Sequence, residues 1–368
     1  MRFSCIQENL NTGLNIISPA VSHGGGLPIL NNILLQAQPE GVYLTATNLE
    51  VGIKCLVRGK TEENGEFTVP ARLFSEYVGL LSGKVDIELV EQVLNISSGA
   101  ASSKLKGLPA SEFPLLPQIQ EGAKCVFKLK DLLGAIEQVV FAASSQETRP
   151  EIGGVFIKID PKEKVATFAA TDSYRLAERK IPVEAEKEVI LIIPHKTMQG
   201  LARILSINKA ADGEVKMESS ANQVSFSCDN IELVSRLVDG VYPDYEQIVP
   251  KEFKTEAVVE KDALVKAMKT ASLFSRSGIY DVTMEAVIGS GLKIGSASGQ
   301  LGEHSATVEA DVKGDGGVIV FNYRYVLDGL QAIKSPKITV RTIDGNNPCL
   351  FSPTDEKGYL YVVMPIRQ

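Results

Sequence analysis

A long internal repeat is the feature that most constrains the fold of this chain. Ala170-Thr171-Asp172 lies 124 residues after Ala46-Thr47-Asn48, and the same offset relates Ile193-Pro194 to Val69-Pro70. A third, more diverged copy keeps the order, with Ala297-Ser298 and Phe321-Asn322 in equivalent places. Solenoid repeats have periods of roughly 20–50 residues, whereas this period is about a third of the chain. The sequence therefore predicts three similar domains in tandem.

Each copy is predicted to open with an amphipathic helix, because apolar residues recur at spacings of three and four. These residues are Ile6, Leu10, Leu14 and Ile17; Leu132, Leu133, Ile136, Val139 and Val140; and Leu264, Val265, Met268 and Leu273. Short alternating segments between turn residues follow, which indicates antiparallel strands with one covered face.

A second helix is predicted just beyond Val69-Pro70, Ile193-Pro194 and Phe321-Asn322, since proline near the first turn suits a helix start. Its apolar positions are Leu73, Leu80 and Leu81; Met198, Leu201 and Ile204; and Val326, Leu330 and Ile333. The predicted fold class is α+β, with two helices packed on antiparallel sheets in each domain. Polar stretches after proline-marked segments place the domains at residues 1–121, 122–252 and 253–368.

Composition excludes several classes of protein. Of the 368 residues, 44% are hydrophobic and 23% charged, as in ordinary globular proteins, and no run approaches the roughly 18 apolar residues of a membrane span. The start of the chain has no secretory features, and five widely spaced cysteines suit buried thiols in a reducing cytoplasm, without disulfides or zinc. A net charge of −7 argues against a uniformly basic coat for nucleic acid, so any contact with phosphate must be local.

The sequence lacks the common catalytic motifs. The chain has no phosphate-binding glycine loop, no dinucleotide fingerprint and no nucleophile elbow. His23, His195 and His304 lie far apart and lack metal-ligand spacing. Asp172 and Arg175 could form a catalytic acid with its orienting partner, but a local pair at a strand end or turn is the simpler interpretation. No catalytic residue, metal or cofactor is predicted.

Basic residues gather on the predicted helices: Arg72 in the first copy; Lys196, Arg203 and Lys209 in the second; Lys261, Lys266, Lys269 and Arg276 in the third. A solvated helix face explains each set alone. If equivalent helices line one surface, however, these charges form a stripe that meets phosphates without reading bases.

With these features together, the chain resembles the bacterial DNA polymerase III beta subunit family, the sliding clamps. The matching stretches are Leu27 to Leu34, Thr68 to Arg72, Ala170-Thr171-Asp172 with Arg175-Leu176-Ala177, Leu237 to Gly240 with Pro243-Asp244-Tyr245, Phe321-Asn322 with Tyr325 to Asp328, and Tyr361 to Gln368. They follow the family's order over the whole length.

The resemblance implies a DNA clamp fold and a head-to-tail homodimer that closes a ring around duplex DNA. Its implied function is a non-catalytic processivity factor that tethers the DNA polymerase III alpha subunit, the clamp loader complex and other proteins with clamp-binding motifs. The residues implied to face DNA are Arg72, Gln146, Lys196, Arg203 and Lys266.

The resemblance also implies a pocket for partner peptides between the second and third domains. Carried over position by position, it comprises Ile152, Thr171, Tyr174, Arg175, Leu176, Pro243, Gln247, Ile248, Asn322, Tyr325, Asn346, Val362, Met364, Pro365, Ile366 and Arg367. Such an apolar set with a few polar groups suits a peptide. Departures from the family pattern occur at Ser173-Tyr174, Gln247 and Gln368, and at His23 to Gly26 in a loop implied to face DNA.

Two other classes of protein fit the sequence less well. An enzyme would need converging acidic residues or a nucleophile with its base, and the sequence shows neither. A three-domain scaffold or adhesion protein would not need basic residues on equivalent helices.

Overall fold

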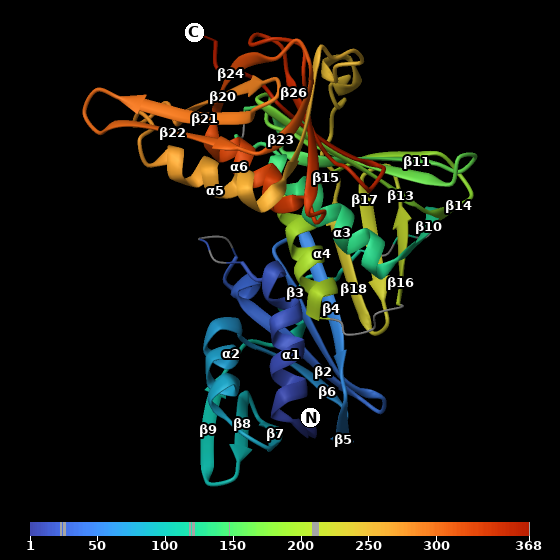
Figure 1. The fold of residues 1–368 in the computed structure, drawn as a ribbon. Coiled ribbons are helices and arrows are strands. Elements are labelled where there is room, and N and C mark those ends of the chain that lie inside the picture. The colour runs from blue at the N-terminus through green and yellow to red at the C-terminus, as the bar shows by residue number, and fades with distance from the viewer. Residues whose placement is uncertain are drawn as a thin grey trace. The chain divides into compact units, whose positions relative to one another are not determined.

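The computed structural model describes residues 1–22, 24, 27–117, 119, 122–146, 148–207 and 213–367 (Figure 1). The described residues do not include residue 121, at the expected domain boundary, nor His23, Gly25, Gly26, Lys209 and Gln368. The chain forms two compact units: unit 1 comprises Met1–Leu133, Val183–Lys187 and Lys196–Leu237, and unit 2 comprises Gly134–Pro182, Glu188–His195 and Val238–Gln368. Within the described ranges, no helix is long and apolar enough to cross a membrane.

Unit 1 contains two antiparallel sheets. The smaller has the order β5-β1-β7-β8-β9 and comprises β1 (Arg2–Ile6), β5 (Gly59–Glu63), β7 (Lys84–Val90), β8 (Val93–Ser98) and β9 (Ala101–Lys106). The larger has nine strands in the order β14-β10-β16-β17-β18-β4-β3-β2-β6. They are β2 (Asn32–Gln38), β3 (Gly41–Thr47), β4 (Val51–Val57), β6 (Gly65–Pro70), β10 (Ala123–Lys128), β14 (Glu184–Ala185), β16 (Glu214–Ser219), β17 (Gln223–Cys228) and β18 (Ile231–Arg236).

The larger sheet of unit 1 runs without a break from the first copy of the repeat into the second. The joint is the antiparallel pair β18 and β4, in which Leu233 lies opposite Ile53 and Ile231 opposite Cys55. Backbone hydrogen bonds between strands satisfy polar groups that would otherwise be exposed at two sheet edges. The repeated domains are therefore linked by main-chain pairing.

The helices of unit 1 are α1 (Gln7–Ile17), α2 (Ala71–Leu80) and most of α4 (His195–Ile207), with short 3-10 turns at Ser18–Ala20, Pro28–Asn31 and Ala110–Glu112. Residues Leu10, Leu14 and Ile17 of α1 are buried, and α1 packs on β4 and beside α2 (Figure 1). On α4, Met198, Leu201 and Ile204 are buried, as the sequence predicted.

Two predictions for unit 1 are wrong. Ile6 belongs to β1, where strand alternation turns it outward, and is 55% exposed. In α2 the buried residues are Ala71, Phe74 and Val78, whereas Leu73 and Leu80 are exposed by 53% and 86%. Leu73 and Leu80 are seven residues apart and so share a helix face, opposite the face that contains Phe74. This helix therefore has two apolar faces, only one of which is covered in the chain.

Unit 2 also contains two antiparallel sheets. The larger has nine strands in the order β15-β11-β12-β13-β27-β26-β25-β19-β23, and the smaller has the order β22-β21-β20-β24. The strands of the larger are β11 (Gly154–Asp160), β12 (Val165–Thr171), β13 (Arg175–Pro182), β15 (Val189–Pro194), β19 (Thr255–Glu260), β23 (Ala310–Gly314), β25 (Lys337–Thr342), β26 (Cys349–Pro353) and β27 (Tyr359–Val363). Those of the smaller are β20 (Asp281–Val287), β21 (Gly291–Ser298), β22 (Gly302–Val308) and β24 (Gly317–Asn322).

The larger sheet of unit 2 joins the second copy to the third in the same way. Strand β13 pairs with β27, so Leu176 lies opposite Val362 and Arg175 opposite Val363. The last strand of the chain is therefore inserted between β13 and β26.

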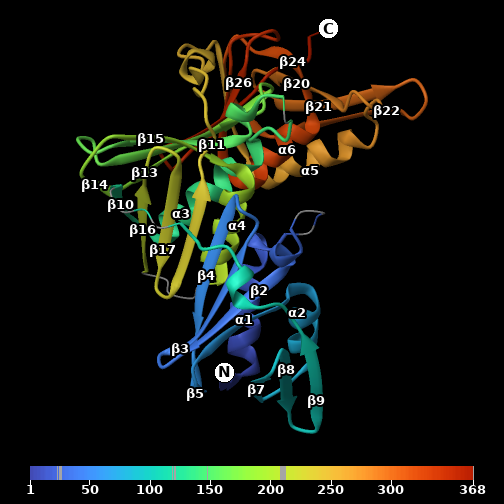
Figure 2. The ribbon, with the colours of Figure 1, turned by 180° about the vertical axis from the view of Figure 1, so that it is seen from behind.

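Unit 2 contains α5 (Lys261–Ser272) and α6 (Tyr323–Ala332), which pack together (Figure 2), and 3-10 turns at Val140–Ala142, Pro150–Ile152 and Tyr245–Ile248. Helix α3 (Leu129–Val139) contributes residues to both units. Leu264 and Met268 are buried in α5, and Val326 and Leu330 in α6, as predicted. Leu273 is instead 70% exposed, because it lies nine residues after Leu264 and therefore on the opposite side of the helix from the buried residues.

Candidate partner and nucleic-acid surfaces

The turn between β12 and β13 is fixed by its own side chains. One carboxylate oxygen of Asp172 accepts hydrogen bonds from the backbone N–H groups of Tyr174 (3.0 Å) and Arg175 (3.1 Å). The hydroxyl of Thr171 donates to the carbonyl oxygen of Arg175 (2.7 Å). Ser173 has φ of 77°, a left-handed conformation that favours glycine, and the surrounding hydrogen bonds hold it there. The turn therefore presents Tyr174 and Arg175 in defined positions.

Arg175 connects this turn to α6. Its Nε donates to Asp172 (2.9 Å), its Nη1 to Asp328 (2.5 Å), and its Nη2 to the carbonyl oxygen of Phe141 (2.9 Å). Burial lowers the pKa of Arg175, but Tyr361 and the two carboxylates outweigh that effect and raise it overall. The local Asp172–Arg175 pair predicted from the sequence is confirmed, and its charges are balanced within the structure.

The chain end continues along the same turn. The Met364 N–H donates to the carbonyl oxygen of Tyr174 (2.9 Å), and the Ile366 N–H donates to that of Val320 (2.8 Å). The hydroxyl of Tyr361 donates to the carbonyl oxygen of Tyr325 (2.7 Å). The terminal segment is therefore held between the β12–β13 turn and β24.

All sixteen residues expected to bind partner peptides lie in unit 2. Their exposure differs. Four of them are buried: Ile152, Thr171, Leu176 and Val362. Seven are half-buried: Arg175, Pro243, Asn322, Tyr325, Met364, Pro365 and Ile366. The other five are exposed: Tyr174, Gln247, Ile248, Asn346 and Arg367. We call these sixteen residues the partner surface.

Two groups of contacts bring parts of the partner surface together. Ile152, Leu176 and Val362 share one buried cluster with Tyr242 and Tyr245. Outside it, the ring of Tyr174, 59% exposed, stacks on Tyr325 with ring centroids 6.2 Å apart. Gln247 and Asn346 make local hydrogen bonds: the Gln247 amide donates to Asp244 (2.7 Å), and the Asn346 N–H donates to Asp344 (2.8 Å).

Sequence reasoning missed the residues that support this surface. Asp328 balances Arg175, Phe141 supplies a carbonyl acceptor, and Tyr245 donates to the buried carboxylate of Glu178 (2.7 Å). An acidic residue in the second turn of a predicted helix gives no signal that an arginine 153 positions away needs a counter-ion.

The residues expected to face DNA differ in how available their charge is. On α4, Lys196 and Arg203 are exposed and seven residues apart, so they lie on one helix face. Lys266 of α5 and the side chain of Gln146 are also exposed. Arg72 is paired with Glu76 (2.9 Å) on α2, Lys261 donates to the carbonyl oxygen of Ile333 (2.8 Å), and Arg276 pairs with Asp281. The most available cations are therefore on α4 and α5.

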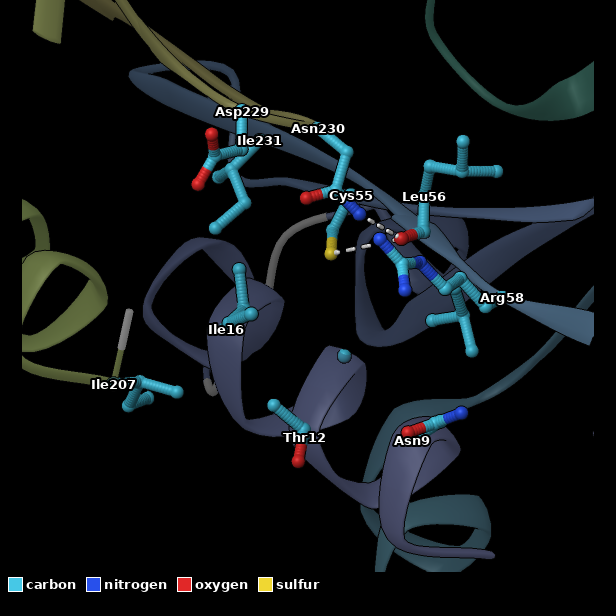
Figure 3. Close-up of a pocket in the computed structure, with 12 residues that line it drawn as sticks. Asn9, Thr12, Ile16, Cys55, Leu56, Arg58, Ile207, Asp229, Asn230 and Ile231 are labelled. Carbon is cyan, nitrogen blue, oxygen red and sulfur yellow. Dashed lines mark hydrogen bonds between the residues drawn. The ribbon is translucent and has the colours of Figure 1, made fainter. Parts of the chain in front are cut away.

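A hollow of about 490 Å³ lies in unit 1 beside α1, with Asn9, Thr12 and Ile16 along one wall (Figure 3). Two of its polar side chains already bond to the backbone. The Thr12 hydroxyl donates to the carbonyl oxygen of Glu8 (2.7 Å), and the Asn230 amide donates to the carbonyl oxygen of Leu56. Among its described lining residues, Arg58 is an exposed cation and Asp229 an exposed anion. Because these two charges are opposite in sign, the hollow favours neither an anionic nor a cationic ligand.

Three repeated domains, joined by sheets that pass from copy to copy and bearing cations on exposed helices, define the class of DNA clamps. Family models for the DNA polymerase III beta subunit match residues 1–117 (N-terminal domain), 127–244 (central domain) and 246–367 (C-terminal domain). The beta sliding clamp of Bacillus subtilis is 32% identical over 381 residues, covering 100% of both chains.

Solved structures agree with this assignment. The DNA polymerase III beta subunit of Thermotoga maritima has a TM-score of 0.93 at 28% identity, covering 100% of this chain and 99% of that one. A Pseudomonas aeruginosa sliding clamp bound to griselimycin has a TM-score of 0.94 at 28% identity and covers 100% of both. The chain belongs to the DNA polymerase III beta subunit family, the beta sliding clamps. It is a non-catalytic processivity clamp of DNA replication.

Proposed function

We propose that two copies of this chain close head to tail into a ring around duplex DNA, and that the ring tethers the replicative polymerase. The observation that carries this proposal is the pairing of strands between successive copies, β18 with β4 and β13 with β27. A ring would repeat the same kind of joint between two chains and leave fewer sheet edges open.

Strands β9 and β22 are the edges we assign to this joint. Both are outer strands of their sheets and are largely exposed. Strand β9 carries Lys104 and Lys106, and β22 carries Glu303, so the two edges have complementary charge. Exposed leucines accompany them, Leu73 and Leu80 on α2, Leu273 after α5 and Leu301 before β22. Burial of these side chains between two chains would stabilise the dimer.

Inside the ring, Lys196, Arg203 and Lys266 would make the main phosphate contacts, with smaller roles for Arg72 and Gln146. Helix α1 contains neither lysine nor arginine, so the lining is only weakly attractive on that helix. Phosphate contacts from separate cations carry no sequence information, which suits a clamp that slides.

The partner surface would bind short peptides from the DNA polymerase III alpha subunit, the clamp loader complex and other proteins with clamp-binding motifs. Among its apolar and aromatic residues, Tyr174 and Ile248 are exposed. Burying one or two large apolar side chains contributes roughly 1.5–3 kcal/mol each before ordering costs, so we expect single peptides to bind near micromolar and multivalent assemblies more tightly.

Domain boundaries near residues 121 and 252 and a cytoplasmic location are part of the same proposal. The gap between the matched ranges 1–117 and 127–244 supports the first boundary. The start of β19 at Thr255 supports the second, although the central and C-terminal matched ranges meet at residue 245.

Mass in solution tests the ring. A particle near twice 39.7 kDa supports the proposal. A stable monomer at micromolar concentration would contradict it.

A further inference from the structure

The guanidinium of Arg324 lies over an aromatic ring beside the partner surface. Its guanidinium carbon is 3.6 Å from the centroid of the Tyr280 ring, and the rings of Tyr280 and Tyr323 meet edge to face at 6.1 Å. Arg324 is exposed, whereas Tyr280 and Tyr323 are half-buried. The arginine is thus supported from one side and open to solvent on the other.

The backbone fixes this arrangement. Tyr280 has φ of 60°, an uncommon conformation for a bulky residue, and its carbonyl oxygen accepts a hydrogen bond from the Tyr323 N–H (2.8 Å). Asn322 caps α6 by accepting from the Arg324 N–H (3.1 Å). Two members of the partner surface, Asn322 and Tyr325, therefore flank Tyr323-Arg324 in the chain. A strained residue held by its surroundings is a common sign of a functional position.

Arg324 also lacks a carboxylate partner among the described residues, unlike the neighbouring arginines. Arg276 is paired with Asp281, and Arg175 with Asp172 and Asp328. The pKa of Arg324 is raised, mainly by a hydrogen bond with the Tyr323 side chain. Arg324 therefore stays protonated at any physiological pH. The site therefore presents one fixed, uncompensated positive charge.

The geometry favours a carboxylate over a nucleic-acid base. Stacking on Tyr280 covers one face of the guanidinium, and the N–H groups that do not bond the tyrosine side chains remain able to bind a carboxylate. The Tyr280 face that a base would need is already occupied by Arg324. A single cation is also a poor match for the repeated phosphates of a strand.

We propose that Arg324, supported by Tyr280 and Tyr323, is an anion-binding subsite that takes an aspartate or glutamate of the partner peptide next to its apolar anchors. This inference rests on the proposed peptide-binding function of the partner surface and adds a charge preference to it. The subsite selects among partners, because a peptide without the acidic residue keeps the apolar contacts and loses only this one.

The test uses fluorescein-labelled peptides from the apolar clamp-binding segment of the cognate polymerase alpha subunit. Each peptide carries aspartate or asparagine at one position flanking the apolar anchors, with every flanking position sampled. Anisotropy titrations with the full-length protein should show tighter binding of aspartate peptides at one position, by about tenfold for a charge-assisted bond.

Arg324→Gln should abolish that preference and leave the affinity for asparagine peptides unchanged. Arg324→Lys should retain part of it, and Tyr280→Leu should weaken it by removing the support. Lys293→Gln removes an exposed cation of β21 and serves as the matched control, with the preference intact. Melting temperatures of all variants check that each is folded.

Persistence of the preference in Arg324→Gln, or no aspartate preference at any position in the native chain, would overturn the inference while leaving peptide binding in place. If peptides of both kinds fail to bind, the partner surface itself is wrong and the inference falls with it. Binding of a labelled oligo-dT that is lost in Arg324→Gln, with peptide binding unaffected, would assign the site to single-stranded nucleic acid instead.

Discussion

Arg175 donates a hydrogen bond to Asp328 at 2.5 Å, although the two residues are 153 positions apart in the chain. The contact joins the first residue of β13 to α6, and Tyr361 of β27 is hydrogen-bonded to the same helix at the Tyr325 carbonyl oxygen. Since the side chain of Arg175 is only 12% exposed, its charge needs these partners. The pair therefore fixes the position of the terminal strand next to the partner surface.

Replacing the two members of this pair should have unequal effects. Arg175→Leu removes three charge-assisted hydrogen bonds and leaves Asp172 without its charged partner, so we expect a loss of about 2–4 kcal/mol in unfolding free energy. Asp328→Asn should cost about 1 kcal/mol or less, because Asp172 still balances Arg175 and Asp328 is nearly half exposed. Urea unfolding measures both, and equal losses would contradict this account of the network.

Local features of this fold could be predicted from the sequence because periodicity and capping are local. The starts of α2, α4 and α6 follow directly from the residues Pro70, Pro194 and Asn322. Which apolar face of α2 is buried could not be predicted, because the face with Leu73 and the face with Phe74 both have helical spacing. The choice depends on packing against α1, which lies far away in the chain.

The candidate site likewise combines local features, which the sequence indicates, with long-range contacts, which it does not. The Asp172–Arg175 pair was visible because its members are three residues apart. The pairing of β13 with β27, the counter-ion at Asp328 and the support of Arg324 by Tyr280 depend on tertiary contacts over long sequence separations. Patterns in a single sequence do not indicate such contacts. Only the family resemblance predicted the partner surface.

Leu273 tests the proposed dimer joint. Leu273→Asp places a charge where we propose that two chains meet, so the dimer should dissociate at least tenfold more readily while the melting temperature of the monomer stays unchanged. Sedimentation velocity across a dilution series measures this. Leu115→Asp is the matched control, since Leu115 is 95% exposed and lies on neither proposed edge. If both variants dissociate equally, or if neither dissociates more readily than the native chain, the joint lies elsewhere.

Charge reversal on α4 tests the DNA-facing surface. Lys196→Glu with Arg203→Glu should weaken DNA binding and reduce its salt dependence by about one logarithmic unit per lost phosphate contact. The matched control, Lys162→Glu with Lys164→Glu, changes the net charge equally in the exposed turn between β11 and β12. If both double variants bind DNA alike at all salt concentrations, α4 does not face DNA.

The chain end is the simplest test of the partner surface. Deletion of Met364 to Gln368 removes the hydrogen bonds of Met364 to Tyr174 and of Ile366 to Val320, but leaves β9 and β22 intact. The shortened chain should remain a dimer and lose at least tenfold in affinity for a polymerase-derived peptide. Full affinity after this deletion would place peptide binding at another surface.

The central claim is that the protein holds DNA by encircling it, and retention on DNA of different topology tests it most directly. The protein is loaded by its clamp loader onto a nicked circular plasmid, and the complex is passed through a gel-filtration column at high salt, which screens phosphate contacts. We predict that the protein stays with the circle and is lost when one restriction cut makes the plasmid linear. Equal retention on circular and linear DNA, or loss from both, would contradict the account.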